Sequence, residues 1–193
     1  MISRAMCVFC SSSNRLSDIY YDMGVNLGKE LGERGYTLVW GGSNVGIMGR
    51  IAQSAKNHGS KLIGIIPQAI YDKGLAFLDA DEIVITTDLR ERKAKMEEKS
   101  DSFVALPGGF GTLEEIIEIV TLNQLKLVNK PIAFLNTDGY FDKLFDFVSH
   151  SISQNFVKES MDSLFLVTED INEIFDYIEN FDYSAIKRRE TKW

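Results

Sequence analysis

The sequence predicts an α/β fold, a doubly wound parallel sheet with helices on both faces. Short apolar runs rich in β-branched and aromatic residues alternate with longer helical patterns along the 193 residues. The apolar runs are continuous, which is typical of strands covered on both faces. Three loops that follow predicted strands are rich in small residues or glycine, and such loops meet at one edge of a parallel sheet. We therefore expect a ligand site at that edge.

Strands and helices follow one another regularly. The predicted strands are 5–10, 36–40, 61–66, 82–86, 102–106, 131–136 and 163–167. The predicted helices are 18–33, 46–58, 89–99, 112–127, 140–155 and 170–180. The longest connection, 67–81, follows a strand end and is a candidate wall of the ligand site. No repeat or boundary divides the chain, so residues 1–193 are expected to form a single α/β domain with a polar, frayed tail over about 184–193.

The composition argues against several classes of function. The formal net charge of −7 disfavours a nucleic-acid groove, because neutralising phosphates needs a basic surface. No run of about 18 apolar residues is present and the first apolar run is too short for a signal peptide, so we expect neither a membrane partner nor secretion. Cys7 and Cys10 lie on opposite faces of one predicted strand, and no second Cys/His pair completes a zinc set. We expect buried, reduced cysteines, no metal and a cytoplasmic location.

Three loops carry the main functional signal: SSSNR (11–15), GGSNVGIMG (41–49) and PGGFG (107–111). Glycine lets the backbone approach a ligand closely, and free N–H groups at the start of a helix favour an anion. The second and third loops run directly into helical patterns, so both are predicted anion seats. Neither is a standard nucleotide signature, since position 114 is glutamate where the dinucleotide pattern needs glycine and the P-loop ending is absent. The alternative is that the glycines only form tight turns.

Two glutamates after the third loop have two interpretations. Thr112 and Glu115 match a capping box, in which Glu115 would bind the backbone N–H of Thr112, and Glu114 suits the first turn of a helix. In the functional alternative the loop holds a phosphate and a carboxylate reaches the sugar attached to it.

The charged segment 89–99 is equally ambiguous. It begins with the capping signal Asp88-x-x-Glu91, and its charges fit a solvated helix face with pairs such as Glu91–Lys95. It also follows a strand end, where Arg92 and Lys93 would bring positive charge to a pocket in an acidic protein.

These residues together resemble a known family. PGGFGTLEE (107–115), the Arg-Lys element in RERKAKM (90–96), VFCSSSN and VWGGSNVGIMG are similar to the motifs of the LOG-type proteins, in the same order. Those are cytokinin riboside 5′-monophosphate phosphoribohydrolases, also labelled possible lysine decarboxylases. The resemblance implies a Rossmann-like, nucleotide-binding homodimer. It would hydrolyse the N-glycosidic bond of a purine (cytokinin riboside or adenosine) 5′-monophosphate to free base and ribose 5-phosphate, without a cofactor.

The resemblance also assigns roles to residues. It implies that Arg92 and Glu115 are catalytic, and chemistry agrees with this, because a carboxylate stabilises positive charge at C1′ while a guanidinium can hydrogen-bond the departing base. It places Gly74 where many members carry a substrate-contacting glutamate. The implied substrate-binding residues are Lys93, Gly108, Gly109, Gly111, Thr112, Glu114 and Thr121, and the first two loops add Ser12, Gly41, Gly42 and Ser43.

Two other classes of function stay open. One is a non-catalytic nucleotide or molybdenum-cofactor carrier of the same fold, which the change at Gly74 favours and the presence of Arg92 and Glu115 disfavours. The other is an interaction protein, because helix 112–127 carries two apolar stripes that predict burial in the core and in a dimer interface.

Overall fold

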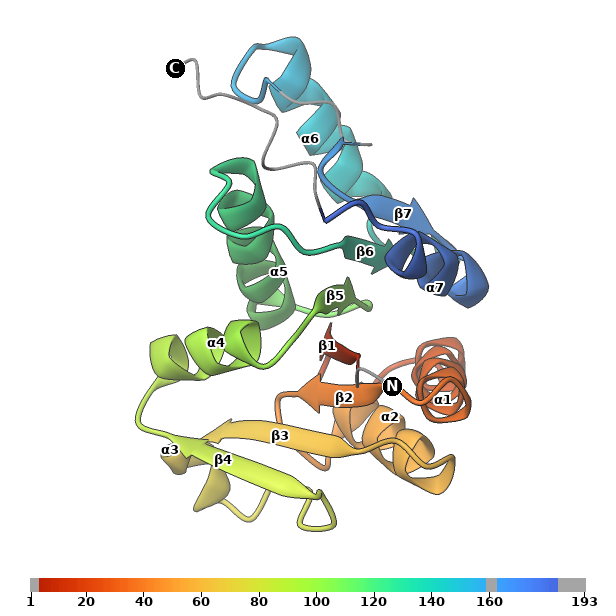
Figure 1. The fold of residues 1–193 in the computed structure, drawn as a ribbon, viewed down its shortest axis with the longest axis vertical. Helices are drawn as coiled ribbons and strands as arrows, with labels where there is room; N and C mark the ends of the chain where they lie inside the picture. The colour runs from red at the N-terminus through yellow and green to blue at the C-terminus, as the bar shows by residue number, and fades with distance from the viewer. Residues whose placement is uncertain (1–3, 159–162, 184–193) are drawn as a thin grey trace.

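The computed structural model describes residues 4–158 and 163–183, and it confirms the predicted fold class (Figure 1). Within these ranges seven strands form one sheet in the order β4-β3-β2-β1-β5-β6-β7, and every neighbouring pair is parallel. The strands are β1 Ala5–Phe9, β2 Thr37–Trp40, β3 Leu62–Pro67, β4 Glu82–Thr86, β5 Ser102–Ala105, β6 Ile132–Leu135 and β7 Leu166–Thr168. The helices are α1 Asp18–Glu33, α2 Gly46–Asn57, α3 Gln68–Tyr71, α4 Leu89–Glu98, α5 Phe110–Gln124, α6 Asp142–Ser153 and α7 Ile171–Glu179, with a 3₁₀ turn at Thr137–Gly139.

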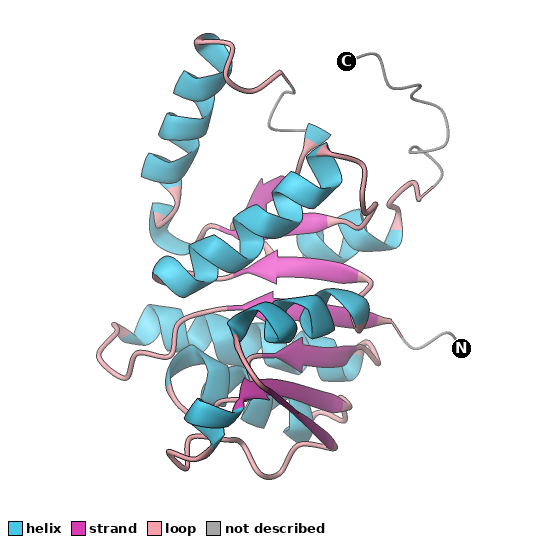
Figure 2. Ribbon diagram, turned by 90° about the vertical axis from the view of Figure 1, so that its left-hand side faces the viewer, coloured by secondary structure: helices cyan, strands magenta, loops and turns pink. Residues whose placement is uncertain are grey.

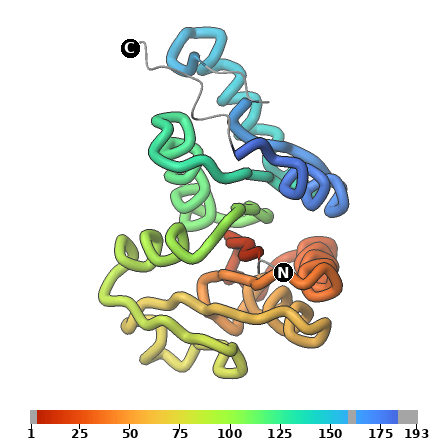
Figure 3. The backbone as a smooth tube through the Cα atoms, viewed as in Figure 1, coloured from red at the N-terminus to blue at the C-terminus, as the bar shows by residue number. Residues whose placement is uncertain are grey.

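The central strand β1 divides the chain into two halves. The chain runs outward from β1 through β2 and β3 to β4, then returns to β5 on the other side of β1 and runs outward again to β7. Figure 3 shows this as a red first strand between an orange-to-yellow half and a green-to-blue half. The strand order reverses between β1 and β5, and in open α/β sheets the crevice at this point is where ligands bind.

Helices cover both faces of the sheet (Figure 2). Buried residues of α1, α2 and α7 pack in one hydrophobic cluster, and those of α4, α5 and α6 pack in another on the opposite face. Successive side chains of a strand point to opposite faces, so Cys7 joins the second cluster and Cys10 the first. Both cysteines are buried and free, as predicted.

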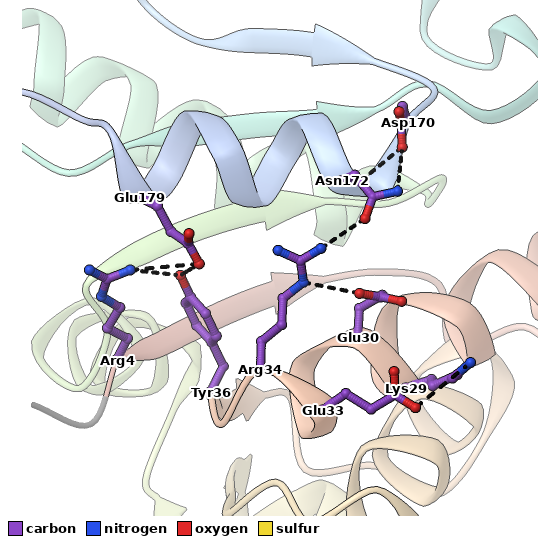
Figure 4. Close-up of polar contacts among 9 residues, drawn as sticks. All are labelled: Arg4, Lys29, Glu30, Glu33, Arg34, Tyr36, Asp170, Asn172 and Glu179. Carbon is purple, nitrogen blue, oxygen red and sulfur yellow. Dashed lines mark hydrogen bonds and ion pairs between the residues drawn. The ribbon is translucent and has the colours of Figure 1, made fainter. Parts of the chain in front are cut away.

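Polar contacts hold the last helix to the first one (Figure 4). The guanidinium of Arg34, just after α1, donates to Glu30 at 3.0 Å and to Asn172 of α7 at 2.8 Å. The same guanidinium lies 4.5 Å from the ring centroid of Phe175. At the other end of α7, Glu179 accepts from Tyr36 at 3.4 Å. These contacts fix α7 on the face that also carries α1 and α2.

Several elements depart from the predicted bounds by a few residues, and α5 ends at Gln124 rather than at residue 127. The connection 67–81 contains the four-residue helix α3, and β7 begins at Leu166 rather than at residue 163. Helix α5 begins at Phe110, two residues earlier than predicted, because the extended backbone of Gly109 caps it. The predicted tail over 184–193 lies outside the described residues. None of the described helices is long and apolar enough to cross a membrane.

Candidate functional site

A cavity of about 470 Å³ lies at the carboxyl ends of the strands. Its walls come from the loops after β1, β2, β3 and β5 and from the first turn of α4, so it occupies the crevice where the strand order reverses. Ten of the residues that the sequence nominated line this one cavity: Ser12, Gly41, Ser43, Arg92, Lys93, Gly109, Gly111, Thr112, Glu114 and Glu115.

Three nominated residues do not line the cavity. Gly108 packs on Thr112, whose hydroxyl occupies the space that a Cβ at residue 108 would need. Gly42 has a positive φ of 71° and its carbonyl accepts from the Phe77 N–H at 2.8 Å, so it shapes the turn after β2. Thr121 is exposed on α5, and its hydroxyl donates to the carbonyl of Ile117 at 2.8 Å.

Arg92 and Glu115 form a buried ion pair in the wall of the cavity. Their side chains are only 8% and 7% exposed, and Nη1 of Arg92 donates to Oε1 of Glu115. Nε of Arg92 donates to the Ile65 carbonyl at 3.0 Å, which anchors the guanidinium to the end of β3. A Cβ at Gly41 would overlap Nη2 of Arg92, so glycine at this position makes room for the guanidinium. Two helices and two strand ends thus fix the geometry of the pair.

Burial and charge act in opposite directions on Glu115. Loss of water raises the pKa of its carboxyl above the usual value, and Arg92 offsets part of this effect by its charge and its hydrogen bond. A desolvated carboxylate beside one fixed cation interacts strongly with charge that develops nearby, because the local dielectric is low.

The capping-box interpretation of Thr112 and Glu115 is wrong. The N-cap of α5 is Gly109, so Thr112 already lies inside the helix, and the carboxylate of Glu115 turns to Arg92 instead of to its own backbone.

On α4 the capping signal is confirmed, since the Asp88 carboxylate accepts from the N–H groups of Arg90 and Glu91 at 2.8 and 2.9 Å. The expected Glu91–Lys95 ion pair is replaced by Lys95–Glu98 at 2.9 Å.

Lys93 does not make the cavity positive. Its ammonium pairs with both Glu114 and Glu118 of α5. Burial lowers the pKa of Lys93, but the two carboxylates outweigh this effect and leave the pKa raised. Among the described residues, the charged side chains that line the cavity are therefore two cations and two carboxylates. The expected positive pocket is corrected to a balanced one, so an anion would have to be held chiefly by other groups.

The start of α5 offers such groups. Leu113 is the first residue of α5 whose N–H is bound by the helix backbone, and it donates to the Gly109 carbonyl at 3.1 Å. Within the described residues, the N–H groups of Phe110, Gly111 and Thr112 have no protein acceptor. Open space surrounds the positions where Gly109 and Gly111 would carry a Cβ. An anion can therefore approach this backbone closely and gain from the helix dipole.

The start of α2 was also predicted to bind an anion, but its N–H groups are already bound by the protein. Its first N–H, that of Gly46, donates to Oδ1 of Asn14 at 2.8 Å. The next two, those of Ile47 and Met48, donate to the carbonyl of Ser11 at 3.0 and 3.4 Å. The first loop thus binds the N-terminus that the second loop was expected to offer to a ligand. That prediction is wrong, and the role of Asn14 was missed.

Much of the remaining wall is apolar and was not nominated residue by residue. Three of these residues, Pro67, Ile70 and Leu75, belong to the connection 67–81, which confirms the prediction that it forms a wall. Gly74 closes the turn after α3 with a φ of 70° and does not line the cavity. The other apolar lining residues are Cys10, Val45, Met48 and Leu89.

The fold and the site define a Rossmann-like α/β protein with a ligand cavity where the strand order reverses. A molybdenum cofactor binding protein from Rippkaea orientalis has the same fold, with a TM-score of 0.69 and 23% identity over 93% of this chain and 97% of that one. The molybdenum cofactor carrier protein of Chlamydomonas reinhardtii gives a TM-score of 0.68 at 18% identity, over 97% of this chain and 99% of its own.

Sequence comparison places the chain in a family. The family described as possible lysine decarboxylase matches residues 48–178. A probable cytokinin riboside 5′-monophosphate phosphoribohydrolase of Oryza sativa subsp. japonica is 37% identical over 92% of this chain and 73% of its own length. A cytokinin riboside 5′-monophosphate phosphoribohydrolase of Arabidopsis thaliana is 36% identical over 92% and 78%. The chain belongs to this family, the LOG family, which confirms the resemblance read from its motifs.

Proposed function

We propose that this protein hydrolyses the N-glycosidic bond of a purine nucleoside 5′-monophosphate, a cytokinin riboside or adenosine monophosphate, to free base and ribose 5-phosphate. The observation that carries the proposal is the buried Arg92–Glu115 pair beside the open N-terminus of α5 in one cavity. The names of the curated relatives, cytokinin riboside 5′-monophosphate phosphoribohydrolases, support it.

The 5′-phosphate binds at the start of α5. The free N–H groups of Phe110, Gly111 and Thr112 and the helix dipole suit a dianion, and the balanced side-chain charges leave this backbone as the main attraction. Binding energy from this unreacting end positions the sugar–base bond next to the buried pair. Five other nominated lining residues contact the rest of the nucleotide: Ser12, Gly41, Ser43, Lys93 and Glu114.

Glu115 and Arg92 act on the two sides of the bond that breaks. As the C1′–N bond lengthens, positive charge builds on the sugar and the Glu115 carboxylate stabilises it. A water molecule adds to C1′ and gives one proton to Glu115. The bond electrons leave with the base, which takes up a proton from the surrounding water while Arg92 hydrogen-bonds it, and Glu115 then returns its proton to water. Because the Arg92 guanidinium already bonds the buried Glu115 carboxyl and offsets part of the rise in its pKa, the site is prepared for the charge that develops.

We also propose a homodimer with an interface on α5. Two residues from the apolar stripes predicted on this helix, Ile116 and Ile119, are buried in the core. Phe110, Ile117 and Leu125 lie on one face of the helix and are 92%, 38% and 44% exposed, which is unusual for large apolar side chains in a row. Light scattering that finds a monomer would contradict the dimer. The buried, unpaired Cys7 and Cys10 support a reducing, cytoplasmic location.

The test of the activity is a panel of nucleoside 5′-monophosphates, each paired with its unphosphorylated nucleoside and analysed for free base. We expect free adenine or N6-substituted adenine from the monophosphates and at least a tenfold lower rate from the nucleosides, because these lack the group that α5 binds. If no monophosphate yields free base, the proposal fails. Tight retention of a nucleotide without turnover would instead favour the carrier alternative.

A further inference from the structure

Tyr140 bonds to the glycine loop from outside the cavity. It follows the 3₁₀ turn after β6, and its hydroxyl donates to the carbonyl of Gly108 at 2.7 Å. The ring of Tyr140 packs edge-on against Tyr20, with centroids 5.8 Å apart. Tyr140 does not line the cavity, whereas Gly109, on the other side of the same peptide bond, does.

The planar peptide connects this bond to the cavity. In a trans peptide the C=O and the following N–H point in opposite directions, and the described residues contain no cis peptide. Because Tyr140 holds the Gly108 carbonyl away from the cavity, the N–H of Gly109 is directed toward it. This N–H precedes the free N–H groups of α5 and extends the same row of donors.

The peptide between Gly108 and Gly109 has little else to restrain it. Neither residue has a Cβ, so both neighbouring backbone torsions are free to take values that other residues avoid. A side chain at 108 is excluded by Thr112, and Gly109 faces open space. A reversal of this peptide would meet no side chain at Gly109, and a reversed peptide would present a carbonyl to an incoming anion.

We propose that Tyr140 is a positioning residue that holds the Gly108–Gly109 peptide with its N–H toward the cavity and thereby sets the affinity for the phosphate group. The proposal rests on the proposed function, which places the 5′-phosphate at the start of α5. Tyr140 touches neither the reacting atoms nor the base, so its effect falls on phosphate binding and leaves the chemical step unchanged.

The test compares Tyr140→Phe with Tyr20→Phe by calorimetric titration of ribose 5-phosphate and of adenine. Tyr20→Phe is the matched control, because it removes a neighbouring hydroxyl that has no hydrogen bond to a described residue. We expect Tyr140→Phe to weaken ribose 5-phosphate binding roughly three- to tenfold, since one hydrogen bond biases the competent orientation by about this factor. Adenine binding should not change. In the hydrolysis assay KM should rise by the same factor and kcat stay within about twofold.

The outcomes separate this proposal from the proposed function. If Tyr140→Phe leaves ribose 5-phosphate affinity unchanged, or if Tyr20→Phe or adenine binding changes equally, the positioning role is refuted. It is also refuted if the unaltered protein binds no ribose 5-phosphate. If the unaltered protein binds ribose 5-phosphate but cleaves no nucleotide, the proposed function fails while the comparison of the two variants still decides the role of Tyr140. Melting temperatures report any general destabilisation, which would affect both ligands alike.

Discussion

Helices α2 and α5 both begin after a glycine-rich loop at the same edge of the sheet, yet their N-termini are used in opposite ways. At α2 the first three N–H groups are bound by Asn14 and Ser11 of the neighbouring loop. At α5 the corresponding groups of Phe110, Gly111 and Thr112 have no acceptor among the described residues. The N–H groups at the start of α2 are bound by the protein itself, whereas those at the start of α5 are open to the cavity.

The difference shows what a glycine-rich turn does and does not specify. In both places glycine lets another group approach the backbone closely. At α2 that group is protein, because a Cβ at Gly46 would overlap the backbone of Ser12. At α5 the space beside Gly109 and Gly111 is empty. A glycine-rich turn therefore lets another part of the protein bind the start of α2 and lets a ligand approach the start of α5.

The largest effect is expected from Glu115, which lies just inside the open end. Glu115→Gln keeps an oxygen that can accept from Arg92 but removes the charge that stabilises C1′. We expect kcat to fall by about 10²–10⁴ while the melting temperature does not decrease. The matched control is Glu98→Gln, an exposed glutamate that pairs with Lys95 on α4. Full activity of Glu115→Gln would remove this residue from the reaction.

The next change gives the N–H groups at the start of α5 a protein acceptor, as those at the start of α2 already have. Gly109 is the N-cap of α5 and has a φ of −88°, which other residues tolerate. Aspartate there would bind the free N–H groups and repel phosphate, so Gly109→Asp should weaken ribose 5-phosphate binding about a hundredfold. It should also add about 1 kcal/mol of stability through capping.

Gly109→Asn is the matched control for the aspartate. It provides a similar cap without the charge, so it should stabilise the fold comparably but weaken binding only about tenfold. Affinity and stability that fall together in both variants would mean that the loop is damaged, and the open-end interpretation would then fail.

The response to pH should come from the open end only, because the amide and carbonyl that bind the start of α2 do not titrate. Burial raises the pKa of Glu115 above its ordinary value of 4.5. If the carboxylate is the active form, kcat/KM should fall about tenfold per pH unit below the raised pKa. A pH–rate profile whose acidic limb lies at or below the ordinary value would contradict this.

As pH rises, the free energy of unfolding should fall where kcat/KM rises. The folded state holds the Glu115 proton more tightly than the unfolded state does, so ionisation costs more in the folded protein. The unaltered protein should therefore lose stability relative to Glu115→Gln as pH rises from 4.5 through the raised pKa. Urea unfolding of both proteins at several pH values measures this difference.

The sequence was sufficient to predict the sheet, because continuous apolar strands alternate with helices, and to place most of the cavity, because the ends of parallel strands meet. It could not decide between local and long-range partners. Glu115 has the spacing of a capping-box glutamate after Thr112, but its carboxylate pairs with Arg92 and not with its own backbone. The hydrogen bond from the Gly46 N–H to Asn14 and the one from the Tyr140 hydroxyl to Gly108 each join residues 32 positions apart, and no local sequence pattern indicates either.

The smallest effect on ligand binding is expected at the closed end. Asn14→Ala removes the acceptor of the Gly46 N–H, which should cost about 1 kcal/mol and lower the melting temperature by roughly 2–4 °C. Asn14→Asp is the control, since it keeps the acceptor and adds a charge that the helix dipole favours. Ribose 5-phosphate affinity should stay within about threefold in both, because Ile47 and Met48 remain bound to Ser11. A second phosphate equivalent bound by Asn14→Ala would show that the first loop merely occupies an anion seat, and the two helix ends would then differ in occupancy and not in kind.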